Sequence, residues 1–320
     1  MSQKHIVVEN LQDLIRCITL SSLLELAGWP KIGNVHRTRD FVQTTFEHFL
    51  AGIATIQPNF FSLCKRINEK VQSKYDNLSI IQLGLFYKQS ALDMINWQSG
   101  GNVLLGHILI LAPLFSAAVI CIKFGLKGLD EFKLIVNRVI EDATIEDTIN
   151  LYKAIRICKP GGLGTIDKYD IYNQNSFEQL REDKITLKKI FQLSMDYDLI
   201  SKEYATGFSI IIDKGVPYLF NTFIQTNNIN ETVVNTFLYI LSEYPDTLII
   251  RKVGKKSAQD VSNLALNILK HKGITSKKGL RLALKYDKKI QKKNGLLNPG
   301  TTADILAGVI FCALIFGLKF

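Results

Sequence analysis

The chain has 320 residues, 47% of them hydrophobic and 21% charged, so it can build a large buried core, and it has no Ser/Gly/Pro-rich linker and no repeat of solenoid period. We therefore predict one domain over residues 1–320. The net charge is +10, and the odd set of five cysteines without a Cys-x-x-Cys pair argues against a disulfide framework and a zinc site. This usage fits a reducing compartment, and "MSQKHIVVENLQD" lacks the apolar run and cleavage site of a secretory signal, so we expect a cytoplasmic protein.

Apolar residues recur at spacings of three and four along most of the chain, which predicts an all-α fold. The first helix follows Asn10 as its N-cap and stops at Gly28, and a second is predicted from about 39 to 56, before Pro58. Only residues 207–220 favour strands, as a short β-hairpin closed by a Lys-Gly turn. Further helices are predicted over residues 60–74, 78–95, 102–124, 128–140, 144–156, 186–204, 229–243, 257–270, 276–292 and 301–317.

Two apolar runs admit two interpretations. Residues 103–122 form a stretch of 20 residues without a charge, long enough to span a bilayer, and residues 305–318 form a shorter one. A pair of helices buried on all sides of a large core would be equally apolar. Gly106, His107 and Pro113 within the first run, and Asp304 before the second, favour buried helices and a soluble protein without a membrane partner.

The segment "GWPKIGNVHR" (28–37) carries more charge than a surface turn needs. It is either a solvated loop or one wall of a site for a charged ligand. Under the second interpretation, Gly33 permits close backbone approach, and the phosphate-binding residues of this region are Lys31, Gly33, Asn34, His36, Arg37 and Arg39.

The next predicted helix carries a polar stripe, because Asp40, Thr44 and Glu47 are spaced by four and three residues. His48 points about 100° away from Glu47 and is either a satisfied core residue or a member of the site. We predict catalytic roles for Glu47 and His48 and a metal-binding role for Asp40.

Glycines dominate "KPGGLGTIDKYD" (159–170), where Gly161, Gly162 and Gly164 could turn backbone N–H groups toward an anion. No Gly-Lys-Ser/Thr follows, so the segment is not a P-loop, and an ordinary turn is the alternative.

Two later segments add phosphate-binding candidates. In "YPDTLIIRKVGKK" (244–256), Thr247 and Arg251 share a face if the segment is helical. In "NPGTTADILAG" (298–308), Asn298 can cap a helix whose free N–H groups and dipole receive phosphate. The phosphate-binding residues predicted here are Thr247, Arg251, Lys252, Asn298, Gly300 and Thr301, and the metal ligands are Asp246 and Asp304. A buried Asp304 needs a cation or a metal, and we also predict it to be catalytic.

Residues 270–293 contain ten Lys/Arg and one Asp, which accounts for most of the net charge. The segment is either a solvated helix face or an attractive surface for polyphosphate or nucleic acid. Lysine dominates, and Tyr286 is the single aromatic residue, so base recognition is not expected and no nucleic-acid partner is predicted.

Taken together, these segments resemble the ordered motifs of the triphosphoribosyl-dephospho-CoA synthase family over residues 20–315, and "NVHR" with "FEHF" is similar to its archaeal branch. The motifs that carry the resemblance are "LLELAGWPKIGNVHR", with Glu25, Pro30, Lys31 and Gly33, "RDFVQTTFEHFL", "GGNVLLG", with Asn102, "PGGLGTIDKYDI", "EYATGF", "DTLIIRKVG" and "NPGTTADILA".

The resemblance implies an all-α transferase that moves the triphosphoribosyl unit of ATP onto the 2′-hydroxyl of 3′-dephospho-CoA and releases adenine. It implies ATP and a CoA-like acceptor as partners, Mg²⁺ as cofactor and a substrate-binding role for Asn102. Loss of adenine develops oxocarbenium character at C1′, so carboxylates and a general base are needed. We predict that Lys31, Arg37 and Arg39 converge with Glu47 and Asp304 on this site.

The chain departs from the bacterial pattern in three motifs, and in the first of them Ile32 stands at the second Pro of Pro-Lys-Pro-Gly. Val103, Leu104 and Leu105 stand where bacterial members carry Thr-His-Lys, and Leu248 replaces the Asn of Asp-Thr-Asn. Two alternatives therefore stay open: a related nucleotide-dependent enzyme with another acceptor, and a non-catalytic nucleotide-binding protein.

Overall fold

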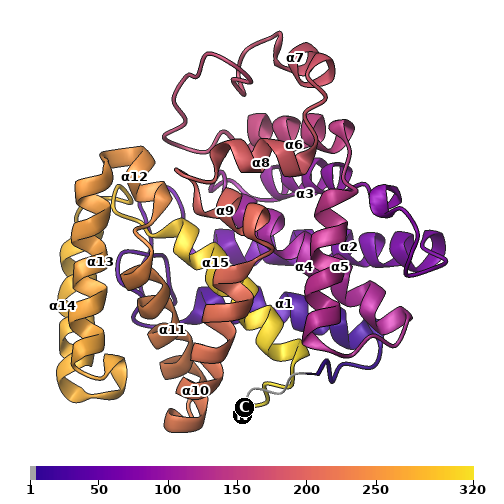
Figure 1. Ribbon diagram of the computed structural model, residues 1–320. Coiled ribbons are helices and arrows are strands. Elements are labelled where there is room, and N and C mark those ends of the chain that lie inside the picture. Colours follow the sequence, from indigo (N-terminus) through magenta and orange to yellow (C-terminus); the bar gives the residue numbers. More distant parts are fainter. Residues whose placement is uncertain (1–4) are drawn as a thin grey trace.

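The computed structural model describes residues 5–320, which form fifteen α-helices and two isolated β-bridges, so the all-α prediction is confirmed (Figure 1). The helices are α1 Leu11–Ala27, α2 Phe46–Lys70, α3 Leu83–Trp97, α4 Leu105–Lys123, α5 Leu129–Glu141, α6 Ile145–Cys158, α7 Ser176–Glu182, α8 Leu187–Ser194, α9 Leu199–Thr206, α10 Val216–Thr226, α11 Ile229–Glu243, α12 Thr247–Val253, α13 Lys255–Lys270, α14 Lys277–Gln291 and α15 Gly300–Ile315. Short 3₁₀ turns lie at Leu78–Ile81 and Gly273–Thr275, and a π-helix covers Ile210–Gly215.

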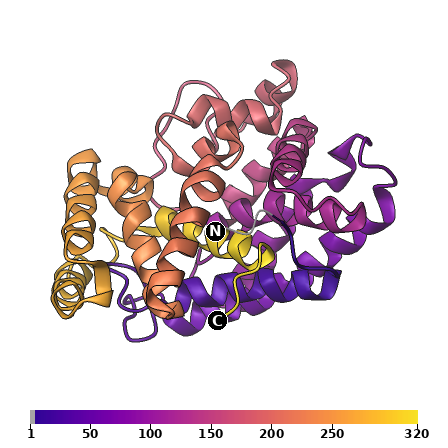
Figure 2. The same cartoon turned by 60° about the horizontal axis from the view of Figure 1, so that its bottom comes forward.

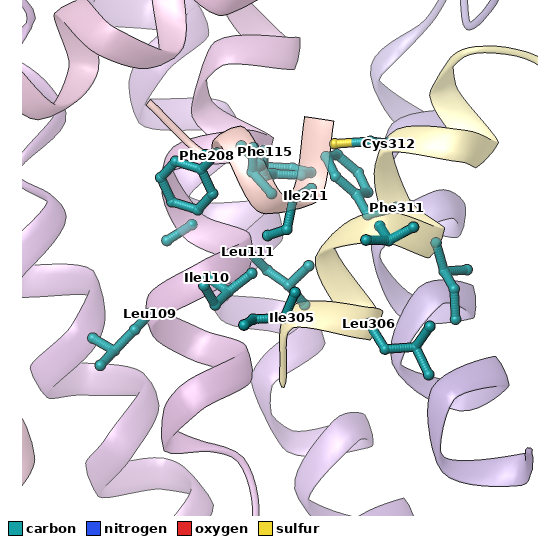
Figure 3. Packing of buried hydrophobic residues seen from close by; sticks show 14 of the residues in the cluster. Leu109, Ile110, Leu111, Phe115, Phe208, Ile211, Ile305, Leu306, Phe311 and Cys312 are labelled. Carbon is teal, nitrogen blue, oxygen red and sulfur yellow. The ribbon is translucent and has the colours of Figure 1, made fainter. Parts of the chain in front are cut away.

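The core is built around α4 and α15, which pack against each other and are buried along almost their whole length. Figure 3 shows side chains of both helices meeting those of the π-helix. Gly308 permits this close packing, since a Cβ there would lie 2.6 Å from Ile211 Cδ1 and 2.7 Å from Ile110 Cγ2.

The apolar run in α4 belongs to this core. By length and composition α4 could cross a membrane, but 89% of its apolar window is buried inside the fold. A helix that is apolar on all sides is what the centre of a large helical protein requires. The prediction of buried helices in a soluble protein is therefore confirmed.

The other helices surround this pair. Helices α6, α7 and α8 lie at the top of Figure 1, and α13 and α14 stand side by side at the left. Figure 2 shows α1 running across the bottom of the molecule, where it contacts α15 and α2. The N-cap prediction for α1 is confirmed, because the Asn10 side chain accepts a hydrogen bond from Asp13 N at 2.8 Å.

The predicted boundary at Pro58 is wrong, because α2 runs through the proline from Phe46 to Lys70. Ile56 and Phe60, on either side of Pro58, are both buried in the core. Burial of this continuous apolar face outweighs the loss of one backbone hydrogen bond. Residues 39–45 are outside the helix, which starts only at Phe46, where Asp40 Oδ1 accepts the backbone N–H at 2.8 Å.

The predicted β-hairpin over 207–220 is also wrong, because this segment is the π-helix followed by the first turns of α10. The buried Glu203 carboxylate accepts the backbone N–H groups of Ile210 at 2.9 Å and Ile211 at 3.0 Å. The π-helix begins with three consecutive isoleucines, and all three side chains are buried. Tertiary packing thus overrides the strand preference of β-branched residues.

Three helices, α7, α10 and α12, were not predicted as separate elements, and the predicted helix over 186–204 is divided into α8 and α9. The division occurs because Asp198 caps α9 by accepting the backbone N–H of Ser201 at 2.9 Å. This break places Asp198 beside a cavity.

Candidate functional site

A cavity of about 710 Å³ opens between α4, α6, α8, α9 and the start of α15. Pro160, Gly162 and Gly164 of the loop between α6 and α7 form part of its lining. The side contributed by α6, α8 and this loop is largely apolar, whereas the starts of α4 and α15 contribute charged groups. A large apolar pocket with a few convergent polar groups is the usual form of a small-molecule site.

Four charged residues from distant parts of the chain meet at the polar side, and we call them the charged cluster: Glu25, Lys31, His107 and Asp304. Lys31 Nζ donates to Glu25 Oε1. His107 Nδ1 lies 2.7 Å from Asp304 Oδ1, and His107 Nε2 lies 3.4 Å from Glu25 Oε2. Glu25, His107 and Asp304 line the cavity, and Asp304 is the most accessible member of the cluster, with 18% of its side chain exposed.

The cluster holds His107 in its charged form. Burial alone lowers the pKa of His107, but the hydrogen bond to Asp304 and the nearby Glu25 carboxylate outweigh burial and raise this pKa to about 9. The charged His107 thus lies between two carboxyl groups, and opposite charges placed this close offset one another's burial. Burial raises the pKa of Asp304, although His107 opposes the shift, and this favours Asp304 as a proton acceptor.

A second polar group lies beside the cluster. Arg251 Nη1 binds Asp198 Oδ1 at 2.7 Å. Within residues 5–320, neither Arg251 Nε nor Asn298 Oδ1 has a hydrogen-bond partner, although both atoms are buried. Both residues line the cavity. Buried polar atoms are normally paired, so these two mark positions where a ligand can complete the hydrogen bonding.

Asp246 lies behind this group and caps two helices. Its Oδ1 accepts the N–H groups of Leu248 at 2.9 Å and Ile249 at 3.1 Å in α12, and its Oδ2 accepts the N–H of Thr302 at 2.7 Å in α15. Burial raises the pKa of Asp246 to about 6, although the bonds from Thr302 oppose this shift. The structure gives Asp246 a capping role, because both oxygens accept backbone N–H groups and the residue is outside the cavity lining.

Asp246 also changes the prediction for the start of α15. The N-cap is Pro299, so the prediction that Asn298 is the cap is wrong by one residue. A protein carboxylate already occupies the first turn of α15, the position predicted for a phosphate.

Gly33 and His36 of the loop "GWPKIGNVHR" contact α14, and Asn34 is the one predicted phosphate-binding residue of this loop that lines the cavity. Gly33 N donates to Asp287 Oδ1 at 2.9 Å, and His36 Nε2 lies 3.3 Å from Asp287 Oδ2. Gly33 is needed for packing, since its φ is +76° and a Cβ would lie 2.5 Å from Ile290 Cγ2. Lys31 points into the core and is fully buried, so it reaches the site only through Glu25.

The structure brings about half of the predicted site residues to the cavity. Those that line it are Asn34, Asn102, Gly162, Gly164, Arg251, Asn298, Gly300, Thr301 and Asp304. Within residues 5–320, those outside its lining are Lys31, Gly33, His36, Arg37, Arg39, Asp40, Glu47, His48, Gly161, Asp246, Thr247 and Lys252.

Most residues of the second set have structural contacts instead. Arg37 Nε donates to Ala27 O at 2.7 Å, and Arg39 and Glu47 are exposed at the surface. His48 caps α2 by accepting the N–H of Thr45 at 2.9 Å, and Lys252 Nζ donates to Gly295 O at 3.1 Å. Of the five residues predicted to converge on one site, Lys31 and Asp304 belong to the charged cluster. Arg37, Arg39 and Glu47 lie outside the cluster and outside the cavity lining.

With this geometry established, comparison with known proteins gives the family. Residues 11–319 match the CitG family, ATP:dephospho-CoA triphosphoribosyl transferase. The chain belongs to this family. Over 116 residues, 36% of this chain, it is 28% identical to Protein CitXG of Leuconostoc mesenteroides subsp. cremoris, and the match spans 24% of that relative.

The CitG fold is also seen in a crystal structure from Archaeoglobus fulgidus, of a protein provisionally assigned as a triphosphoribosyl-dephospho-CoA synthase. The two structures agree with a TM-score of 0.64 at 24% sequence identity, over 86% of this chain and 100% of the other. At this identity the likeness shows the shared fold, and the family match over residues 11–319 confirms the resemblance inferred from the motifs.

Sequence reasoning missed several residues of this CitG site, above all Glu25 and His107. Both gave a signal: Glu25 opens the Glu-x4-Pro-Lys-x-Gly motif, and His107 is the one ionisable residue within the apolar run over 103–122. A polar group in such a helix needs a buried partner, and here the partners lie on α1 and α15. Asp198 gave a weaker signal, as a helix cap in a segment predicted to be one helix.

The charged cluster predicts a loss of stability at alkaline pH. The pKa of His107 rises from an ordinary 6.5 to about 9 in the fold, so its stabilisation is complete below pH 6.5 and is lost as pH rises through 9. The free energy of unfolding falls by at most about 3 kcal/mol as His107 loses its proton. We expect the Tm of the ligand-free protein to fall across this interval, and His107→Gln to flatten the fall. His48→Gln is the control and keeps the wild-type slope; an unchanged slope in His107→Gln contradicts the assignment.

Proposed function

We propose that this CitG-family chain transfers the 5-triphosphoribosyl unit of ATP to the 2′-hydroxyl of 3′-dephospho-CoA and releases adenine. The observation that carries the proposal is the Asp304 carboxylate, held by His107 at the cavity wall with a raised pKa. Its Oδ2 makes no hydrogen bond within residues 5–320, so it is available to a substrate.

Asp304 acts as the general base in this proposal. The bond from ribose C1′ to adenine breaks, and adenine leaves with the bonding electrons and gains a proton. The acceptor hydroxyl forms the new bond to C1′ and gives up its proton to Asp304; Asp304 then releases this proton to water, and the leaving adenine takes one proton from water, so that the proton count balances. The negative charge of Asp304 also favours the oxocarbenium character that develops at C1′. His107 and Glu25 hold the carboxylate in place.

The charges of the cavity support a role for Mg²⁺ with the triphosphate. The cationic side chains that line it are His107, Lys168 and Arg251. Lys168 is paired with Asp183 at 2.7 Å and Arg251 with Asp198 at 2.7 Å, and His107 is held by the cluster. Little protein charge is therefore left to neutralise two phosphorylated substrates.

Mg²⁺ fits this donor set when the substrate supplies most of its ligands. Within residues 5–320 there is no group of three or more His, Cys, Asp or Glu side chains that could hold a metal. Mg²⁺ usually keeps several waters and binds substrate phosphates. Because Asp304, the predicted metal ligand that reaches the cavity, is the general base in this proposal, the triphosphate would supply the remaining ligands of the ion. The ion would neutralise part of the charge of the triphosphate, and the unpaired Nε of Arg251 would donate a hydrogen bond to a phosphate oxygen.

We expect Mg²⁺-ATP to stabilise the folded protein. A ligand that binds only the native state adds about 2.7 kcal/mol at a concentration a hundred times its Kd. Thermal unfolding with millimolar Mg²⁺-ATP should show a raised Tm, and ATP with excess chelator should raise it less. A melting curve unmoved by Mg²⁺-ATP would count against every nucleotide-dependent function.

A product assay tests the reaction itself. The protein is incubated with Mg²⁺-ATP and dephospho-CoA, and the mixture is analysed by mass spectrometry. Free adenine together with a coupled product of both substrates supports the proposal. ATP turnover without adenine indicates a related enzyme with another reaction, and tight binding without turnover indicates a non-catalytic nucleotide-binding protein. We further propose that the protein acts in the cytoplasm, as its five unpaired cysteines favour.

A further inference from the structure

Four large apolar side chains stand half exposed around the mouth of the cavity, and we call them the apolar rim. They are Ile166, Tyr172, Leu193 and Tyr197, with exposures of 52%, 49%, 54% and 58%, and all four line the cavity. They come from the α6–α7 loop, from α8 and from the α8–α9 connection. Exposed apolar groups gathered at a pocket indicate a surface that a ligand covers.

Behind the rim, the cavity lining is apolar and firmly packed. Phe191 stacks on the buried Tyr204 with ring centroids 3.9 Å apart, and Ile190 and Ile155 line the same side. This packing fixes the surface before a ligand arrives. The apolar rim and these residues thus form one continuous apolar surface.

The polar groups on this side are already satisfied within the protein. Tyr152 Oη donates to Tyr169 O at 2.7 Å. The Asp170 carboxylate accepts the backbone N–H groups of Ile166 at 3.0 Å and Tyr172 at 2.7 Å. Lys168 is paired with Asp183. A phosphate or the polar edge of a base would find few free partners here, whereas the methyl and methylene groups of an uncharged chain need none, and amides of such a chain can stay hydrated at the half-exposed rim.

We propose that the apolar rim binds the uncharged arm of the acceptor, the pantetheine portion of dephospho-CoA; this inference rests on the proposed function. Among the parts of the two substrates, the phosphate chains are charged and both adenines have several polar edge atoms. The arm is long and neutral and is rich in methyl and methylene groups. It gains binding free energy by leaving water against an apolar surface. The acceptor is then selected at the rim, away from the reacting hydroxyl at Asp304.

The test compares two acceptors in a double variant, Leu193→Ser with Tyr197→Ser. Both side chains are more than half exposed, so the fold should tolerate the change. ADP serves as the second acceptor, because it retains the adenosine hydroxyls and the diphosphate but lacks the arm. The matched control is Tyr75→Ser with Leu134→Ser, two residues exposed by 80% and 60% that do not line the cavity.

We expect kcat/KM for dephospho-CoA to fall at least tenfold in the double variant, mainly through KM. The value for ADP and the KM for ATP should stay at the wild-type level, as should every value in the control. An equal loss with both acceptors, an increase in the KM for ATP, or no loss at all would overturn the inference. The second of these outcomes would assign the rim to the adenine of ATP.

Calorimetric binding separates this inference from the proposed function. If adenine is not released with either acceptor, the proposed reaction fails, but the rim can still be tested. Wild-type protein should bind dephospho-CoA at least tenfold more tightly than ADP, and the double variant should lose this preference. Equal affinities in the wild type would overturn the inference whether or not the enzyme turns over.

Discussion

Asp304→Asn is expected to lower kcat about a thousandfold while leaving the fold intact. The variant keeps the size of the side chain and an oxygen that can accept from His107, so the close fit against Gly106 is preserved. It removes the negative charge and the proton acceptor, and general-base catalysis of this kind contributes roughly 10²–10⁴-fold. Adenine release under saturating substrates measures the effect.

The matched control for this prediction is Glu47→Gln. Both carboxylates were predicted to be catalytic, but Glu47 is exposed on α2 and outside the cavity lining. We therefore expect Glu47→Gln to retain nearly full activity. If Asp304→Asn kept more than a tenth of the wild-type rate, the general base would have to be another group.

Lys31→Met is expected to destabilise the protein by about 3–5 kcal/mol, the usual cost of leaving one partner of a buried ion pair alone. Lys31 is fully buried and donates to Glu25, which is 3% exposed. Methionine fills a similar volume but leaves the Glu25 carboxylate without its ammonium partner. Denaturant unfolding at pH 7 measures the loss.

Two further variants make this prediction specific. Glu25→Gln with Lys31→Met removes one charge of each sign, so the remaining pair of His107 and Asp304 is neutral and part of the stability should return. Lys188→Met breaks an exposed pair with Glu141, 2.6 Å apart, and should cost little. Wild-type stability in Lys31→Met would show that the ammonium contributes nothing to the fold.

Local patterns were sufficient for much of the fold. Residues 229–243 match α11 as predicted, and the Asn10 cap fixes the start of α1, because both depend on neighbours within a few residues. Pro58 and the isoleucines after Ser209 were misjudged, because buried contacts with distant helices decide their conformation. Such contacts leave no mark in a short window of sequence.

The site shows the same division. Asp304 and Arg251 were found because two local patterns are visible: a carboxylate before an apolar helix, and an arginine four residues after Thr247 on one helix face. The pairing of His107 with Asp304 joins residues 197 positions apart, so their spacing carries no information about it. Arg37 and Arg39 were included because they are close to Lys31 in sequence, but a loop can turn its side chains in opposite directions. Sequence neighbourhood was therefore a poor guide to shared chemistry.

The double cap formed by Asp246 has a consequence for the timing of catalysis. One carboxylate fastens the first turn of α12 to the first turn of α15, and these helices carry Arg251 and Asp304. In the proposed mechanism, Arg251 as the phosphate-binding side chain and Asp304 as the base are thus set relative to each other when the chain folds, before any nucleotide arrives. The entropy cost of fixing these two side chains is met when the protein folds, so substrate binding does not have to offset this cost. Asp246 would shape the rate without ever touching the reacting atoms.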